Sequence, residues 1–335
     1  MFNFFNDRYD TIYNSNFHLN LFKDFEGKNI LITGANGYIA RTIIECLLKF
    51  SKNVNIYITS RNFVKIKHDD RINKVYDLSA LKDIGLHYII HTASPTQSKF
   101  FINNPVDTIN TIYNDLINLL DFAVNKKVLN FCFLSTLEVY GDTNLEKVKE
   151  ADCGNLDVLN CRNSYPAIKK LCEHLLCAYF HQYGLNSFAL RLCQVIGPGF
   201  DLNDNRVYAD FLRQAICNKE IIINSDGSTT RDYIDVFDVA MGILYTLFNS
   251  KTFNVYNLSN PNYFLSIKEL AELISAYFNI SVNFNKESKK EYLPNFKRTL
   301  DNSLMYSLGY RNLFNLDSSI KDMCYYARKL YENTK

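Results

Sequence analysis

The stretch from residue 29 to residue 50 constrains the fold of this chain more than any other. It opens with an apolar run at 30–32, typical of a buried parallel strand, and an apolar helical pattern follows at 39–48. Between them, Gly34 permits a tight turn, Gly37 lets the backbone approach a pyrophosphate, and Ala40 allows close helix–strand packing. A helix N-terminus attracts phosphate through unpaired N–H groups and partial positive charge. Ordinary strand–helix turns also carry this spacing, so the flanking strand and helix are what favour a nucleotide site.

Strands alternate with helices from residue 29 to residue 192, which predicts an α/β fold built on a Rossmann-type doubly wound parallel sheet. After the first strand and helix, we expect strands at 54–59, at a segment ending at 76–78, and at 87–91, 130–135 and 188–192, with helices at 107–124 and 165–183. Beyond residue 199 we expect shorter elements at 206–217, 221–223, 236–248, 255–258 and 266–278, and a last helix from 317 or 318. These form a smaller C-terminal α/β substrate lobe.

Three regions follow from this pattern. We expect an N-terminal extension at 1–26, an NAD(P)-binding Rossmann domain at 27–195, and a substrate-binding lobe at 196–335 that is interleaved with it. The extension has apolar residues at helical spacing, which predicts a short helix packed on the domain. These residues are Tyr9, Tyr13, Phe17, Leu21, Phe22 and Phe25.

Composition excludes several classes of protein. The net charge of +2 argues against a nucleic-acid or polybasic membrane role, and no apolar run approaches the roughly 18 residues of a membrane span. The N-terminus shows no secretory signal. The nine cysteines are scattered without C-x-x-C pairs, which argues against a disulfide framework and favours a reducing cytoplasm. The cysteines and histidines show no metal-ligand spacing, so we expect no metal site.

The end of the second strand bears on the choice between NAD and NADP. NAD-binding folds usually place an acid there to bond the ribose hydroxyls, whereas this strand ends in Thr59, Ser60 and Arg61. A hydroxyl and a guanidinium suit a 2′-phosphate better. The sequence therefore leans toward NADP, although Arg61 is also compatible with a solvated loop position.

A tyrosine–lysine pair supplies the candidate chemistry. Tyr165 and Lys169 are four residues apart on an expected helix and share one face. A lysine ammonium favours a nearby phenolate, so we expect it to lower the pKa of Tyr165 and make it a general base. The pair Ser135–Thr136 ends the fifth strand, where ligands bind in open sheets, and Thr136 is expected to bond the substrate oxygen. A chance Y-x-x-x-K on a helix surface and a plain strand-end turn are the alternatives.

Taken together, these motifs give a resemblance to a known family. From residue 29 to the C-terminus the chain resembles an extended short-chain dehydrogenase/reductase of the NAD-dependent epimerase/dehydratase family. The motifs are T-G-A-N-G-Y-I-A, H-T-A-S-P, L-S-T-L-E-V-Y-G, Y-P-A-I-K, R-L-C-Q-V-I-G-P-G, N-D-N-R-V, T-T-R-D-Y-I-D-V-F-D-V-A and Y-N-L-S-N-P. Within this family, H-T-A-S-P followed by F-I-N-N-P-V-D-T-I, N-D-N-R-V and T-T-R are most similar to UDP-glucuronate decarboxylases.

The resemblance implies bound NAD or NADP and a nucleotide-sugar substrate. Tyr165 would take a proton from the sugar hydroxyl, at C4, while hydride moves to the nicotinamide and Lys169 contacts its ribose. With Ser60 and Arg61, the implied cofactor contacts are Gly34, Asn36, Gly37, Tyr38, Ile39, Asp77, Leu78, Thr92, Ala93, Ser94, Ser135, Tyr165 and Lys169. The implied substrate contacts are Pro95, Gln194, Arg206 and Arg231, and the catalytic set is Thr136, Glu138, Tyr165 and Lys169.

Departures from the family pattern bear on the reaction. Ile112 and Gln194 replace family asparagines, and Leu137 stands where sugar dehydratases hold the aspartic acid that protonates the departing 6-hydroxyl. Glu138 matches the glutamate that decarboxylases and dehydratases share. Because side chains alternate along a strand, Glu138 should share the face of Thr136 if the strand stays extended. The alternative is a solvated strand-end carboxylate.

The sequence thus favours a UDP-glucuronate decarboxylase-like or sugar-nucleotide dehydratase activity, of the kind that supplies bacterial-type surface polysaccharides. A nucleotide-sugar 4-epimerase or NADP-dependent 4-ketoreductase remains open, as does a catalytically silent nucleotide-binding protein, against which the intact catalytic set argues. The resemblance also implies a homodimer through the 107–124 and 165–183 helices. The second of these is more apolar than a one-faced surface helix requires, with Leu171, Cys172, Leu175, Leu176, Ala178, Tyr179 and Phe180.

Overall fold

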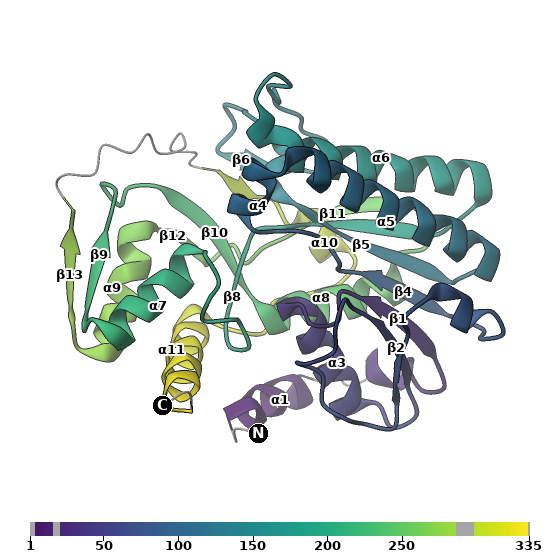
Figure 1. The fold of residues 1–335 in the computed structure, drawn as a ribbon, viewed down its shortest axis with the longest axis horizontal. Helices are drawn as coiled ribbons and strands as arrows, with labels where there is room; N and C mark the ends of the chain where they lie inside the picture. The colour runs from purple at the N-terminus through teal and green to yellow at the C-terminus, as the bar shows by residue number, and fades with distance from the viewer. Residues whose placement is uncertain (1–3, 16–20, 286–297, 334–335) are drawn as a thin grey trace.

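A parallel sheet organises the molecule. The structure is a computed structural model that describes residues 4–15, 21–285 and 298–333. In these residues seven parallel strands form one sheet in the order β11-β7-β5-β4-β1-β2-β3 (Figure 1). They are β1 Asn29–Thr33, β2 Asn55–Thr59, β3 Ile72–Lys74, β4 Tyr88–His91, β5 Asn130–Thr136, β7 Ser187–Leu192 and β11 Asn254–Leu258. The order reverses between β1 and β4, which confirms the Rossmann-type doubly wound fold.

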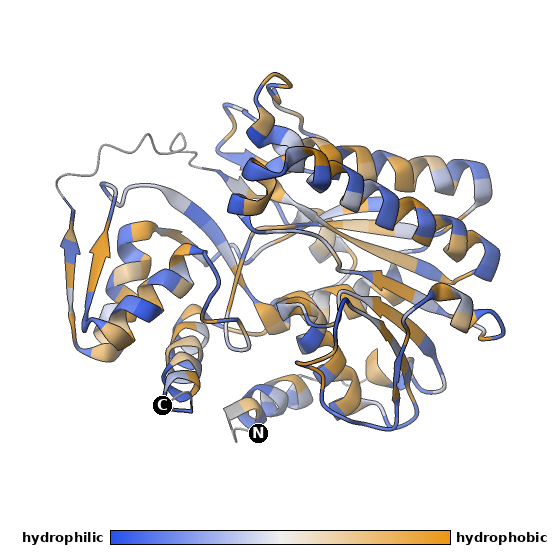
Figure 2. Ribbon diagram, in the orientation of Figure 1, coloured by the Kyte–Doolittle hydropathy of each residue, from blue (hydrophilic) through white to orange (hydrophobic). Residues whose placement is uncertain are grey.

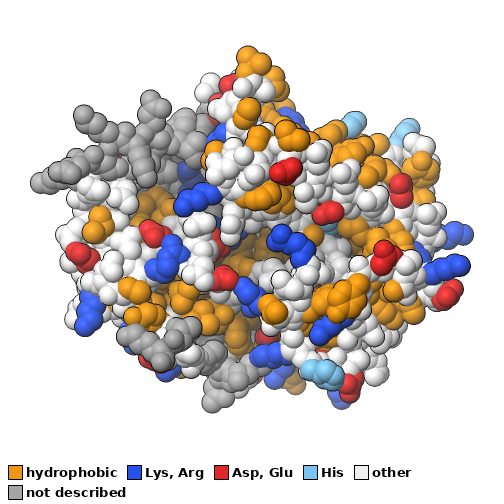
Figure 3. All heavy atoms as spheres, viewed as in Figure 1, with side chains coloured by type: hydrophobic (Ala, Val, Ile, Leu, Met, Phe, Trp, Pro, Cys, Tyr) orange, Lys and Arg blue, Asp and Glu red, His pale blue; other side chains and the backbone are white. Residues whose placement is uncertain are grey.

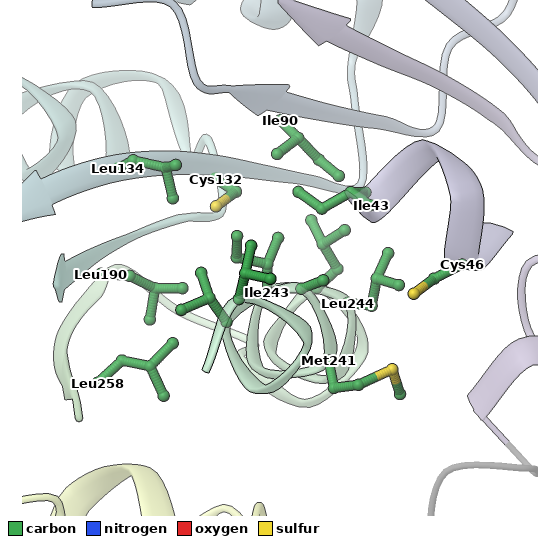
Figure 4. Packing of buried hydrophobic residues seen from close by; sticks show 14 of the residues in the cluster. Ile43, Cys46, Ile90, Cys132, Leu134, Leu190, Met241, Ile243, Leu244 and Leu258 are labelled. Atoms are coloured by element: carbon green, nitrogen blue, oxygen red, sulfur yellow. The ribbon is translucent and has the colours of Figure 1, made fainter. Parts of the chain in front are cut away.

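Helices cover both faces of this sheet. The first face lies against α5 (Pro105–Lys126) and α6 (Ser164–Tyr183), and the second against α3 (Tyr38–Phe50) and α8 (Val236–Asn249). Leu31 and Phe131 pack on the first face. The adjacent residues Ile30, Ile32 and Cys132 pack on the second. Both sides of the central strands β1, β4, β5 and β7 are buried, so these strands are mostly hydrophobic (Figure 2), as is typical of parallel strands covered on both faces. Figure 4 shows the second face, where Ile43 and Cys46 of α3 and residues of α8 meet Ile90, Cys132, Leu134 and Leu190.

A smaller lobe lies beside the sheet. Its helices are α7 (Val207–Cys217), α9 (Ile267–Phe278) and α11 (Leu316–Glu332), and its strands are β8 (Gln194–Ile196), β9 (Glu220–Ile223), β10 (Thr230–Asp235), β12 (Phe264–Ser266) and β13 (Ser281–Phe284). These strands pair as β12-β10-β8 and β13-β9. Ser266 and Glu269 form the predicted capping box of α9. Segments beyond residue 195 also join the main layers, since β11 pairs with β7 and α8 packs on α3. The domain bounds at residues 26 and 195 stay a prediction.

Short elements complete the chain. They are α1 (Phe4–Asn14), η1 (Leu78–Leu81), α4 (Ser98–Asn103), η2 (Leu137–Tyr140), β6 (Lys147–Val148), η3 (Cys161–Asn163), β14 (Thr299–Leu300) and α10 (Ser303–Ser307). The strand expected to end at 76–78 ends earlier, since β3 spans Ile72–Lys74. Asp77 does not end a strand but is the N-cap of η1, where its side chain accepts a hydrogen bond from the Ser79 N–H at 2.7 Å. Among the described residues, no helix has the length and apolar character to cross a membrane.

The N-terminal extension contributes the helix α1, which lies between the sheet layers and the lobe (Figure 1). The Tyr9 hydroxyl donates to Glu45 of α3 at 3.0 Å, and Arg8 pairs with Asp235 and with Asp322 of α11, each at 2.7 Å. The expected apolar stripe was wrong at Tyr13, which is 59% exposed, because the buried face of α1 consists of Arg8, Tyr9 and Ile12. Phe17 lies outside the described residues. The other predicted stripe residues, Leu21, Phe22 and Phe25, are buried.

Candidate active site

A cavity of about 760 Å³ separates the sheet from the lobe. It is lined by the loop after β1, by the ends of β5 and β7, and by lobe residues from α7, β9 and β10. Figure 3 shows this face hollowed near its middle, with Lys and Arg side chains around the opening. The site therefore lies at the carboxyl ends of the parallel strands, where ligands bind in doubly wound sheets.

The glycine turn fits a dinucleotide at one end of this cavity. Gly34 has φ +70°, and a Cβ there would lie 2.8 Å from backbone atoms of Ala93. Gly37 is the N-cap of α3, and within the described residues no side chain caps that helix, so its first N–H groups remain available to a phosphate. A Cβ on Gly37 would lie 3.0 Å from the Gly34 carbonyl oxygen. Ser94 lines the same cavity, and its buried Oγ has no partner among the described residues.

Neighbouring side chains hold this turn in place. The Asn36 amide donates to the carbonyl oxygen of Asn62 in the loop after β2, at 2.6 Å. Tyr38 donates from its hydroxyl to the Gly197 carbonyl at 2.6 Å, and Arg41 donates to the Gly199 carbonyl at 2.5 Å. The helix that starts at the glycine turn is thus tied to the loop that leads into the lobe.

The structure brings most predicted site residues to one cavity, but not all. The lining includes Asn36, Gly37, Tyr38, Ile39, Thr92, Ser94, Ser135, Thr136, Glu138, Tyr165, Lys169, Gln194, Arg206 and Arg231. Gly34 and Ala93 are not part of the lining, although they are close to each other, since a Cβ on Gly34 would lie 2.8 Å from backbone atoms of Ala93. Ser60, Arg61, Asp77, Leu78 and Pro95 are outside this lining. Their assignment to cofactor or substrate stays a prediction.

Tyr165, Lys169 and Thr136 meet at the wall formed by α6 and the end of β5. Tyr165 is 7% exposed and hydrogen-bonds Thr136. The Lys169 ammonium lies 5.8 Å from the centroid of the Tyr165 ring, and it donates to the Leu134 carbonyl at 2.8 Å. The predicted helix face therefore carries both side chains to the strand end that presents Thr136.

The expected lowering of the Tyr165 pKa was wrong for this structure. Burial raises the pKa of Tyr165, and the negative charge of Glu138 raises it further, while Arg206 and the hydrogen bond with Thr136 act in the opposite direction. Burial lowers the pKa of Lys169 to about 8, which weakens its hold on a proton. Burial disfavours both the phenolate of Tyr165 and the ammonium of Lys169, and the spacing of the two residues in the sequence does not show how large this effect is.

Glu138 faces the cavity for a reason that differs from the one expected. The strand does not stay extended, because β5 ends at Thr136, whose side chain accepts from the Glu138 N–H and caps η2. The carboxylate still lines the cavity and pairs with Arg162 at 2.9 Å. Arg231 on β10 also interacts electrostatically with Glu138 and Arg162, and burial lowers its pKa. Glu138, Arg162 and Arg231 form a charged cluster beside the wall that carries Tyr165, Lys169 and Thr136, which we call the catalytic wall.

Sequence reasoning missed residues that shape this wall. Arg162 lies three positions before Tyr165, and that proximity was the one signal that could have indicated it. Phe101 of α4 stacks on the Tyr165 ring with centroids 4.9 Å apart, and the Arg162 guanidinium lies 5.3 Å from the Phe101 centroid. Arg206 donates to Thr96 at 3.2 Å across the cavity. These contacts join segments distant in the chain, so no local pattern indicates them.

The site has no metal-binding character in the described residues, since no three His, Cys, Asp or Glu side chains gather there in a way that could hold an ion. The functional groups that do gather there are the phenol of Tyr165, the ammonium of Lys169, the hydroxyl of Thr136 and the charged cluster. The fold and this arrangement define a dinucleotide-dependent enzyme of the short-chain dehydrogenase/reductase class.

The chain belongs to the NAD dependent epimerase/dehydratase family, whose sequence model matches residues 30–259. Among curated relatives, UDP-glucuronic acid decarboxylase 5 of Arabidopsis thaliana is 29% identical over 262 residues, covering 76% of this chain and 75% of that protein. UDP-glucuronic acid decarboxylase 1 of Xenopus tropicalis is 27% identical over 321 residues, covering 91% and 73%. The predicted family and class of enzyme are thereby confirmed.

Solved structures confirm the fold. A UDP-glucose 4-epimerase of Thermotoga maritima superimposes with a TM-score of 0.78 at 21% identity, covering 90% of this chain and 99% of that one. The epimerase Mth375 of Methanothermobacter thermautotrophicus gives a TM-score of 0.82 at 18% identity, covering 94% and 96%. At these identities the likeness concerns architecture alone.

Proposed function

We propose that this chain oxidises the sugar of a nucleotide sugar at C4 and then decarboxylates it, with UDP-glucuronate as the substrate to test first. The observation that carries the proposal is the meeting of Thr136, Glu138, Tyr165 and Lys169 on one wall of a cavity that also contains the glycine turn. The curated relatives described above, which are UDP-glucuronic acid decarboxylases, support the same choice.

The proton transfers can be assigned to side chains of this wall. Bound NAD would supply the hydride acceptor for oxidation of C4. Tyr165, as phenolate, takes the proton of the C4 hydroxyl while Thr136 hydrogen-bonds the same oxygen. The C6 carboxylate is then part of a β-keto acid. The C5–C6 bond breaks, CO2 leaves, and the electron pair moves to the C4 oxygen. A solvent proton, relayed by Glu138, adds at C5. Return of the hydride to C4 and of the Tyr165 proton to the C4 oxygen would then complete a UDP-pentose.

The charged cluster favours an anionic sugar. In the described part of the site, Arg162 and Arg231 face the single carboxylate of Glu138, so the cluster carries an excess positive charge. Arg162 is 23% exposed and Glu138 32%, so the pair is only partly hydrated. A sugar carboxylate near this cluster would offset the excess, whereas a neutral hexose would not. This supports decarboxylation over dehydration, together with Leu137 at the position of the dehydratase acid.

Product analysis tests the proposal directly. The protein is incubated with NAD and, separately, UDP-glucuronate, UDP-glucose, dTDP-glucose and a GDP-hexose, and the products are analysed by mass spectrometry. We expect loss of CO2 from UDP-glucuronate. Loss of water from a neutral hexose would show a dehydratase, and an isomer of unchanged mass would show an epimerase. Either outcome, or no turnover at all, would overturn the decarboxylase proposal.

Glu138→Gln separates binding from the later steps. Because Tyr165 and Thr136 remain, we expect the variant to bind UDP-glucuronate and to complete the first hydride transfer, so that reduced nicotinamide and the 4-keto sugar accumulate in a single turnover. Glu272→Gln is a matched control, since Glu272 is exposed on α9, pairs with Lys268 and is not among the residues that line the cavity. Completion of the reaction at the parent rate by Glu138→Gln would assign Glu138 a structural role.

A preference for NADP over NAD belongs to the same proposal. Arg61 is exposed in the loop after β2, and a 2′-phosphate contact there would be charge-assisted. Calorimetric titration of the parent protein and Arg61→Ala with NAD and NADP tests this. A larger loss for NADP supports the contact, and equal losses exclude it.

We also propose that the protein is a homodimer through α5 and α6. Large apolar side chains are exposed along these helices, which a monomer would leave in water. They are Val106, Ile109, Tyr113, Leu171 and Tyr183. Light scattering at micromolar concentration is expected to give twice the mass of the chain, and a monomer would contradict the proposal.

A further inference from the structure

A buried ion pair lies directly behind the catalytic wall. Glu173 is one helical turn beyond Lys169 on α6 and is 5% exposed. Its Oε1 accepts from the Ser135 hydroxyl at 2.5 Å and from Arg191 Nε at 3.0 Å, and its Oε2 accepts from a terminal Arg191 nitrogen at 2.7 Å. Such a two-pronged bond with a buried carboxylate is both strong and directional. None of the chemical steps above uses Glu173.

The carboxylate of Glu173 joins the helix to two strands. Ser135 and Arg191 are register partners in the β5–β7 pair, and Ser135 immediately precedes Thr136. Arg191 also donates to the Glu150 carbonyl at 2.9 Å, and its guanidinium lies 4.6 Å from the centroid of the Tyr140 ring. The end of β5 is therefore fixed to α6 at the residue next to the catalytic threonine. A shift of Glu173 would change the separation of Thr136 and Tyr165.

The charge of Glu173 also reaches Lys169. Burial lowers the pKa of Lys169 to about 8, and the neighbouring Cys172 and Glu173 act in the opposite direction. Burial raises the pKa of the Cys172 thiol to about 12, so it is neutral at neutral pH. His91 of β4, which also faces Lys169, is neutral because burial lowers its pKa to about 3. Of these described neighbours of Lys169, Glu173 is the carboxylate, and the structure holds it in an ion pair with Arg191 at 2.7 Å.

We propose that Glu173 is a positioning residue for the catalytic wall. Through Ser135 and Arg191 it fixes Thr136 opposite Tyr165, and its negative charge favours the ammonium form of Lys169. The ammonium in turn favours the phenolate of Tyr165 that the reaction needs. This inference rests on the proposed hydride transfer, but its first consequence concerns Lys169 alone and is measurable without turnover.

Glu173→Gln is the first test. The amide keeps the size of the side chain and can still accept from Ser135, but it leaves the Arg191 cation without its counter-charge. Titration of Lys169 is followed by NMR on protein with ¹³C-labelled lysine, with Lys169→Arg used to assign the signal. We expect the Lys169 titration midpoint to fall by about one unit, at the low end of the effect of an opposite charge within ~4–6 Å. An unchanged midpoint would overturn the inference.

Two further variants test whether a fall of the Lys169 titration midpoint in Glu173→Gln results from a disturbed fold and not from the lost charge. Glu173→Gln combined with Arg191→Met removes both charges of the buried pair, so it avoids an uncompensated cation. We expect this double variant to fold and still to lower the Lys169 midpoint, because Glu173 is the partner that acts on Lys169. Ser135→Ala removes one hydrogen bond without changing charge, and the midpoint should stay at the parent value. A fall as large in Ser135→Ala would show that packing, not charge, controls Lys169.

Single-turnover kinetics supply the functional readout. Reduction of NAD by UDP-glucuronate is measured between pH 6 and about 10. Loss of the ammonium raises the pKa of Tyr165, so the rise of the rate with pH should move to higher pH in Glu173→Gln. A purely structural defect would lower the rate by the same factor at every pH and would refute the charge role. If the parent protein does not reduce NAD at all, the proposed function fails, while the NMR titration still decides the role of Glu173.

Discussion

The helix α1 should be an essential part of the fold, because it carries a buried cation. Arg8 is 2% exposed and pairs with Asp235, which is fully buried, and with Asp322. Its guanidinium lies 5.1 Å from the centroid of Phe237 and 4.7 Å from that of Phe314. Burial alone would lower the pKa of Arg8, but the two aspartates raise it. The substitution Arg8→Met keeps the aliphatic length and removes the charge.

The expected loss of stability depends on which aspartate is left without a counter-charge when Arg8 is replaced. Asp322 is 29% exposed and can be hydrated, whereas Asp235 cannot, although it still caps α8 and accepts from Ser319. Breaking a buried pair costs roughly 3–5 kcal/mol. With an unfolding entropy of about 2.1 cal/mol/K per residue, 335 residues give about 0.7 kcal/mol/K. Arg8→Met should therefore lower Tm by roughly 4–7 °C.

Differential scanning calorimetry at pH 7 measures this shift. Lys268→Met is the control, because its partner Glu272 is 3.7 Å away and both side chains are more than half exposed. Its Tm should stay at the parent value. Adding Asp235→Asn to Arg8→Met removes the stranded charge and should recover part of the loss. A Tm within about 1 °C of the parent for Arg8→Met would refute the idea that this ion pair secures α1.

Three other predictions follow from the site and the core. Tyr165→Phe should retain cofactor but lose roughly 10²–10⁴ in the rate of nicotinamide reduction, and full activity would end the assignment. Gly37→Val should abolish NAD and NADP binding in calorimetric titration, whereas Gly85→Val, at a site with open space around its Cβ, should not. Burial raises the pKa of Asp238 to about 8, so its stabilising effect is full below about pH 4 and is lost as pH rises through 8. Tm of the parent should thus fall relative to Asp238→Asn between pH 5 and about 8, and parallel profiles would contradict this.

Local patterns were enough to predict the strands of the main sheet, the longer helices and their order. The glycine turn, the strands of the sheet and the Ser266–Glu269 capping box depend on residues close together in the chain, and each lies where the sequence places it within a few residues. Errors arose where two local choices competed. Asp77 caps a turn instead of ending a strand, and Thr136 ends β5 by capping η2, so Glu138 reaches the cavity by a different route.

Burial and long-range pairing, in contrast, were decided by the tertiary structure. The sequence could place Tyr165 four residues before Lys169, but desolvation sets their pKa values and depends on everything packed around them. Arg162 meets Glu138 over 24 positions, which no periodicity encodes.

The distinction between local motifs and long-range contacts also explains which features could be predicted from the sequence. By itself, the sequence predicted the family, the glycine turn and the tyrosine–lysine pair, because these reside in short contiguous motifs. The role of the N-terminal extension was decided only by the fold. No neighbour of Arg8 in the sequence indicates that it is buried, because 227 positions separate it from Asp235, the partner that makes its burial possible. A buried charge is stable only beside its counter-charge, and the fold alone brings these two together.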